Sequence, residues 1–198
     1  EELADGVIPG GPDKKAYDRT ATSSVTTKNA TERATALAVE GDRAEFYNCK
    51  VLSSQDSLFI QQYTHTYFKN CLIEGNTDYI FGDGDAVFEK CNLSWYGYSD
   101  IEGGGYVTAV KDTATYGYLF MNCNVVMNPD TNMKAATGTF GRPWGPKAQV
   151  RFINTKLQSA SLIGATGWSS MSASTPENAR YHEFNTTLMD GTAVSTAS

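Results

Sequence analysis

Two aspartates stand at the same distance from a repeated motif. Asp56 follows Cys49 by seven residues, and Asp78 follows Cys71, in the next copy, by seven; Asp130 also lies seven residues beyond Cys123 of a later copy. If successive turns of the chain stack in register, equal offsets place these carboxylates about 5–7 Å apart. Carboxylates so close do not both ionise cheaply, so one pKa rises and one carboxyl keeps its proton near neutral pH. The pair therefore predicts an acid and a nucleophile or base made from one residue type.

Three further side chains complete this chemistry. Gln55 places an amide donor beside the first aspartate, and Arg142 and Trp144 share a short turn stiffened by proline. An arginine fork orients one ionised carboxylate, and an exposed indole offers a flat apolar face to a sugar ring. Each residue alone also fits a turn, a salt bridge or a core position, and aspartate is common in turns. Together they predict an active site.

The elements that must position this site follow from a repeat. An aromatic residue, two further residues and a cysteine recur four times, and a fifth copy carries threonine in place of cysteine; the copies are 46–49, 68–71, 88–91, 120–123 and 152–155. Apolar and polar residues alternate around each copy, and turn residues follow, which is typical of strands. Coils of about 20 residues favour a β-solenoid, with longer spacings as coils that carry an extra loop. An antiparallel sandwich or barrel is the alternative.

The four cysteines of the repeat allow two interpretations. They can stack in the core as small apolar side chains. Because adjacent coils lie about 4.8 Å apart, Cys49–Cys71 or Cys91–Cys123 can also form disulfides. The sequence leaves both open.

Composition limits the classes of function. A chain of 198 residues suits one domain, 1–198, in which 1–19 is expected to be loop-like, 20–29 a strand and 187–198 a polar tail. The net charge is −6 and basic residues do not cluster, which argues against nucleic-acid binding. An apolar run long enough for a membrane helix is absent. The Cys and His spacings match no common zinc motif, so neither a metal nor another cofactor is expected.

Three stretches in the expected order carry a family resemblance. They are Gln55-Asp56-Ser57-Leu58, Gly75-Asn76-Thr77-Asp78-Tyr79-Ile80-Phe81-Gly82 and Gly141-Arg142-Pro143-Trp144. They resemble the signatures of the pectin methylesterases (pectinesterases), and the likeness runs from about 34 to 184. This resemblance implies an all-β, right-handed parallel β-helix that is secreted and removes methyl esters from the galacturonosyl residues of pectin.

The resemblance also implies roles for individual residues. Asp78 matches the nucleophile, Asp56 the general acid and base, Arg142 the residue that orients Asp78, and Gln55 a donor to the oxyanion. Trp144 matches a substrate-contacting aromatic residue, and the groove would be lined by Phe81, Tyr106, Ala109 and Met171.

The sequence departs from the family pattern at three points. Arg33 stands where the family has a second glutamine that serves the oxyanion. Its guanidinium would either stabilise that negative charge or cross to an aspartate and lessen the difference between the two pKa values, and activity would be reduced or redirected to another ester. Few strands precede the matched region, so N-terminal coils are expected to be missing or shortened, and the protein to be a monomer unless another chain completes the helix. Ser57 and Tyr79 replace the more usual threonine and phenylalanine.

Other functions share some of these features. A glycoside hydrolase also uses two close carboxylates. A pectate-lyase-like activity would need calcium, for which Asp83 and Asp85 are the candidate ligands, although both also suit a turn. A polysaccharide-binding β-helix without catalysis is the alternative from another class.

Overall fold

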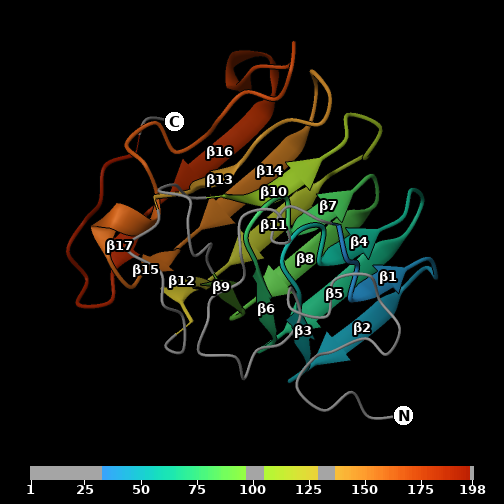
Figure 1. Cartoon of the computed structure of the whole chain (residues 1–198), viewed down its shortest axis with the longest axis horizontal. Helices are drawn as coiled ribbons and strands as arrows, with labels where there is room; N and C mark the ends of the chain where they lie inside the picture. Colours follow the sequence, from blue (N-terminus) through green and yellow to red (C-terminus); the bar gives the residue numbers. More distant parts are fainter. Residues whose placement is uncertain (1–32, 97–104, 129–136, 197–198) are drawn as a thin grey trace.

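The chain winds into stacked coils whose strands form three parallel sheets, and the last described coil contributes strands to only two of them (Figure 1). The computed structural model describes residues 33–96, 105–128 and 137–196. The first sheet consists of β1 (Leu37–Val39), β4 (Leu58–Ile60), β7 (Ile80–Gly82), β10 (Tyr106–Val110) and β13 (Thr139–Gly141). Its strands pair in order along the solenoid axis. The right-handed parallel β-helix predicted from the sequence is therefore confirmed.

The other two sheets complete each coil. The second sheet consists of β2 (Ala44–Tyr47), β5 (His65–Lys69), β8 (Asp85–Glu89), β11 (Tyr118–Met121), β14 (Gln149–Ile153) and β16 (Arg180–Phe184). The third consists of β3 (Lys50–Leu52), β6 (Leu72–Gly75), β9 (Asn92–Trp95), β12 (Asn124–Met127), β15 (Lys156–Leu157) and β17 (Thr187–Leu188). Two short 3₁₀ helices, η2 (Ala160–Leu162) and η3 (Pro176–Asn178), lie between the later strands. Among the described residues no helix has the length and apolarity needed to span a bilayer.

The repeated aromatic residue forms a stack through the core. The rings of successive coils are nearly parallel, with centroids 4.3–5.0 Å apart, in the order Phe46, Phe68, Phe88, Phe120 and Phe152. Each ring covers the next because the parallel register places identical positions of neighbouring coils opposite each other. The stack therefore fixes the register of the whole ladder.

Asparagine recurs in the repeat because its backbone adopts a left-handed conformation there. The residue between the second- and third-sheet strands has a positive φ of 54–58° in six coils, and it is Asn48, Asn70, Lys90, Asn122, Asn154 and Asn185. Asparagine adopts this left-handed conformation more readily than most residues. The side chains also form a ladder in the later coils, where Asn185 donates to Asn154 at 2.8 Å and Asn154 donates to Asn122 at 3.2 Å.

The cysteines are free thiols, and those in the interior stack as core residues. Cys71, Cys91 and Cys123 are buried, whereas Cys49 is exposed in the first described coil. Neither of the two disulfides that the sequence allowed is present. Burial in apolar surroundings raises the pKa of the Cys71 thiol, so this side chain is a packing residue and not a nucleophile.

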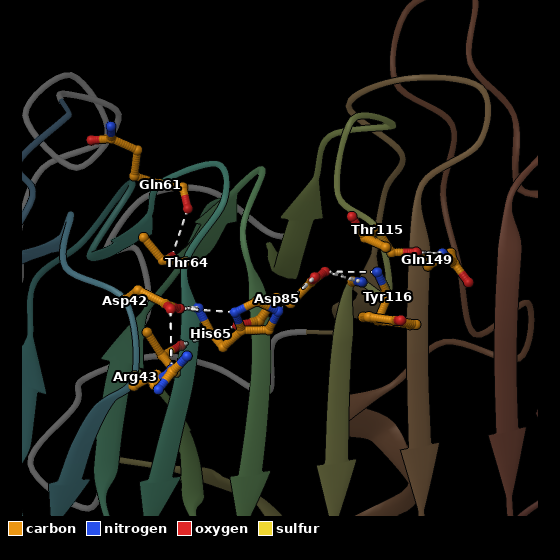
Figure 2. A network of polar contacts seen from close by, with 11 residues as sticks. Asp42, Arg43, Gln61, Thr64, His65, Asp85, Thr115, Tyr116 and Gln149 are labelled. Atoms are coloured by element: carbon orange, nitrogen blue, oxygen red, sulfur yellow. Dashed lines mark hydrogen bonds and ion pairs between the residues drawn. The ribbon is translucent and has the colours of Figure 1, made fainter.

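Polar contacts tie together the coil corners that follow the first sheet (Figure 2). The backbone N–H of His65 donates to Asp42 Oδ1 at 2.8 Å. The His65 ring lies between two carboxyl groups. Its Nδ1 is 2.8 Å from Asp42 Oδ1, and its Nε2 is 3.9 Å from Asp85 Oδ2. Asp85 Oδ1 in turn accepts hydrogen bonds from the backbone N–H groups of Tyr116 and Gly117. The hydrogen bond to His65 lowers the pKa of Asp42. These contacts hold four successive corners in line.

The end of the chain corrects one expectation. The segment 187–198 was expected to be a polar tail, but Thr187 and Leu188 form β17, which pairs in parallel with β15. Leu188 packs against the core, so the solenoid continues into this segment. The expected loop at 1–19 and strand at 20–29 lie outside the described residues.

Removal of one ring from the stack tests how much the register depends on it. Phe88 is fully buried between two rings, so Phe88→Ala is expected to lower the free energy of unfolding by about 3–5 kcal/mol. The control is Phe184→Ala, whose side chain is 69% exposed, with an expected change within about 0.5 kcal/mol. Urea unfolding followed by circular dichroism measures both. Equal effects of the two substitutions would show that the stack does not carry the fold.

Candidate active site

The two aspartates lie on adjacent coils at facing positions. The bridge between Gln55 and Thr77 and the pair between Leu58 and Ile80 fix the register, so Asp56 lies opposite Asp78. Strands in such a ladder are about 4.8 Å apart. The two aspartates, which share one offset from the repeated motif, therefore occupy equivalent positions in neighbouring coils, just before β4 and β7.

A left-handed backbone conformation presents both carboxyl groups at the start of a strand. Asp56 has a φ of 57° and Asp78 a φ of 50°. Aspartate tolerates this region because its short polar side chain can bond locally. Because asparagine shares this tolerance, Asp→Asn removes the charge at these positions with little backbone strain. Asp→Ala removes the charge and also adds backbone strain.

Arg142 binds one of the two carboxylates in a bidentate pair. Its Nε donates to Asp78 Oδ1 at 2.8 Å, and its Nη2 donates to Oδ2 at 2.6 Å. The guanidinium also lies over the ring of Tyr106, with 4.0 Å from Cζ to the ring centroid. Burial alone would lower the pKa of Arg142, but the Asp78 carboxylate outweighs burial and raises it. This bidentate geometry fixes the orientation of the Asp78 carboxylate.

A glycine permits this placement of the arginine. Gly141 ends β13, and a Cβ built there would lie 2.0 Å from Thr108 Oγ1 of the neighbouring strand. The side chain of any other residue would push β13 away from β10. The Gly-Arg dipeptide therefore brings the guanidinium close to the aspartates of earlier coils.

Asp56 has a different environment. Burial and the charge of Asp78 raise its pKa to about 6, against the lowering effects of Arg33, of a hydrogen bond from Gln55 and of Arg142. Arg33 approaches through its Nε, which lies 3.3 Å from Asp56 Oδ2. The two carboxyl groups therefore have unequal environments, because Asp56 has a raised pKa and Asp78 is paired with a guanidinium.

A cavity of about 440 Å³ opens over the pair. Its lining includes every residue that the sequence predicted for the site except Tyr106; these are Arg33, Gln55, Asp56, Asp78, Phe81, Ala109, Arg142, Trp144 and Met171. Tyr106 instead packs with its ring against the guanidinium of Arg142. Trp144 is exposed at the cavity, 6.3 Å from the ring of Phe81.

Thr35 also lines the cavity, and the sequence analysis did not name it. It stands two residues after Arg33, and alternate residues of an extended chain face the same side. The spacing of two residues from Arg33 could therefore have identified Thr35 as a lining residue.

The remaining acidic candidates lie elsewhere and are bound to protein donors. Asp83 is 3.8 Å from Lys111 Nζ and accepts a hydrogen bond from Thr113, and Asp85 accepts the two backbone N–H groups described above. Within the described residues, no group of three or more His, Cys, Asp or Glu side chains is arranged to hold a metal ion. A second cavity, of about 270 Å³, lies beside His65 and contains neither Asp56 nor Asp78.

Fold and site together define a parallel β-helix protein with an open cleft built on a pair of unequal aspartates. The model of the family described as Pectinesterase matches residues 16–196, and this chain belongs to that family.

Individual relatives agree with this assignment. Pectinesterase A of Emericella nidulans is 37% identical over 144 residues, which cover 70% of this chain and 41% of that protein. The structure of the pectin methylesterase from Yersinia enterocolitica matches with a TM-score of 0.69 and 29% identity, over 94% of this chain and 61% of that one. A pectin methylesterase solved in complex with a hexasaccharide matches with a TM-score of 0.66 and 28% identity, over 80% of this chain and 52% of that one. The chain spans less than half the length of the curated relatives it matches.

The raised pKa of Asp56 has a consequence for stability. An aspartate with an ordinary pKa of 3.8 when unfolded and about 6 when folded stabilises the fold below pH 4, and this contribution is lost as the pH rises through 6. Asp56→Asn removes the charge, so it is expected to increase the free energy of unfolding at pH 7.5 by about 2 kcal/mol. At pH 3.5 the variant and the wild type should be equally stable. Urea titrations at both pH values measure the difference, and a destabilised variant at pH 7.5 would contradict the assigned environment.

Proposed function

We propose that this protein is a carboxylic ester hydrolase that removes methyl esters from galacturonosyl residues of pectin. The observation that carries the proposal is the facing aspartate pair, in which only Asp78 is bound by a bidentate arginine. Membership of the Pectinesterase family and the hexasaccharide complex of a related pectin methylesterase support pectin as the substrate. The protein would act as one catalytic β-helix domain, 1–198, secreted and monomeric.

The ionised carboxylate of Asp78 begins the reaction. One of its oxygens attacks the C6 carbonyl carbon of the methyl ester and forms a tetrahedral intermediate with a negative oxygen. The amide of Gln55 at the cavity wall donates to that oxygen. As the intermediate collapses, protonated Asp56 gives its proton to the departing methoxide, so methanol leaves and an acyl-enzyme remains.

Water completes the cycle. Asp56, now ionised, takes a proton from a water molecule whose oxygen adds to the acyl carbon. The bond to Asp78 then breaks, which restores the Asp78 carboxylate and releases the galacturonic acid. Asp56 ends in the protonated form in which it began. The apolar faces of Trp144 and Phe81, with Ala109 and Met171, line the path of the sugar rings, and Arg33 lies at the same cavity.

Exchange of the two carboxyl groups for amides tests these roles. Asp78→Asn should reduce methanol release from methyl-esterified pectin by about a thousandfold or more, because the nucleophile is lost. Asp56→Asn should reduce it by about 10²–10⁴-fold, because the proton donor is lost. The control is Asp190→Asn, an exposed aspartate outside the cavity, which should leave the rate unchanged.

Methanol and reducing ends are measured together in this assay. New reducing ends without methanol would indicate a glycoside hydrolase. Binding of pectin without either product would indicate a binding protein. Turnover by Asp78→Asn at the wild-type rate would overturn the assignment of the nucleophile.

The rate should also depend on pH through Asp56. Because this residue must carry a proton in the free enzyme and its pKa is raised to about 6, kcat/KM should fall as the pH rises through that value. Initial rates of methanol release between pH 4.5 and 8 measure the profile. A kcat/KM that rises through pH 6 would contradict the role of Asp56 as the acid of the first step.

A further inference from the structure

We propose that Arg33 is a specificity-determining residue that binds a free uronate carboxylate of the substrate, next to the ester being cleaved. The site then favours pectin that has already lost some of its methyl esters. This inference rests on the proposed function, because it assigns the charge pattern of the substrate for the same cavity.

Arg33 is held less tightly than the other arginine of the site. Its contact with Asp56 involves only Nε at 3.3 Å, and its side chain is 79% exposed. Arg142, by contrast, pairs through two nitrogens and is 22% exposed. Across residues 33–96, 105–128 and 137–196, Arg33 makes no other hydrogen bond or ion pair. Toward these residues most of its donors are unused, and Arg33 lines the cavity in which a ligand would bind.

The cavity carries an unpaired positive charge at the start of the proposed reaction. When Asp56 carries the proton that it must donate, Arg33 loses its counter-ion. Asp78 and Arg142 neutralise each other, so one positive charge is left uncompensated at the cavity. A guanidinium binds a carboxylate through two parallel hydrogen bonds, and a uronate is the anion that a partly de-esterified polymer supplies.

The proposed reaction itself produces uronate carboxylates. Each turnover converts a neutral methyl ester into a carboxylate on the polymer. A carboxylate that moves to Arg33 holds the chain while the next ester occupies the position between Asp56 and Asp78. The protein as a whole carries a net charge of −6, so a local cation is needed to attract a polyanion to this cavity.

Binding of a product oligomer tests the inference without any turnover. The probe is the fully de-esterified galacturonate hexamer, titrated by calorimetry at pH 5 and low salt. Arg33→Gln should weaken its binding about tenfold, which is the loss expected for one charge-assisted pair. The affinity of Arg33→Lys for the hexamer should lie between those of the wild type and Arg33→Gln, because lysine keeps the charge but cannot make two parallel hydrogen bonds.

A matched control is available in the same coil. Arg43 also approaches an aspartate through Nε, 3.5 Å from Asp42 Oδ2, and is 89% exposed, but it does not line the cavity. Arg43→Gln makes the same change in net charge and should leave the affinity for the hexamer unchanged. Wild-type affinity in Arg33→Gln, or an equal loss in both variants, would overturn the inference.

Kinetic selectivity gives the second readout. The ratio of kcat/KM for half-esterified to fully esterified homogalacturonan should fall about tenfold in Arg33→Gln, and added salt should lower the same ratio in the wild type. An unchanged ratio in Arg33→Gln would overturn the inference. Failure of the proposed function looks different: the wild type would release no methanol, while the loss of hexamer binding in Arg33→Gln would still support the assigned carboxylate site.

Discussion

The parallel register between adjacent coils is the constraint on which the rest of the structure depends. It places Asp56 opposite Asp78, and it places Phe46, Phe68 and Phe88 in one stack. A slip by one residue would turn the core positions outward and separate the carboxyl groups. The fold and the site are therefore held by the same interactions, and the stacked rings stabilise both.

The chemistry follows from an asymmetry that the register alone does not provide. Facing carboxyl groups of one type would share their charge equally in a symmetrical environment. Here Arg142 binds Asp78 through two hydrogen bonds, while the nearest guanidinium to Asp56 makes one long and exposed contact. Burial and the neighbouring charge raise the pKa of Asp56, so this side chain keeps its proton up to about pH 6. Two arginines of unequal geometry thus separate the roles of two identical side chains.

Much of this arrangement could be predicted from the sequence, because a solenoid converts equal spacing into spatial neighbourhood. The five copies of the repeat predicted a β-solenoid, and the family resemblance implied that it is a right-handed parallel β-helix. The two equal offsets placed Asp56 and Asp78 on neighbouring coils, and both line the same cavity. Side-chain directions were less accessible. The sequence left open whether Arg33 crosses to an aspartate, and it did not predict that Tyr106 packs against Arg142, because both contacts depend on rotamers that spacing does not determine. The strand β17 was missed because two residues carry too little periodicity to identify a strand.

The most direct measurement is a ¹³C NMR titration of the Asp56 carboxyl carbon in the wild type and in Asp78→Asn. The account predicts a midpoint near pH 6 in the wild type and a lower midpoint in the variant, because one of the two causes of the raised pKa is the charge of Asp78. A midpoint near 3.8 in the wild type, or one that does not move in the variant, would contradict it.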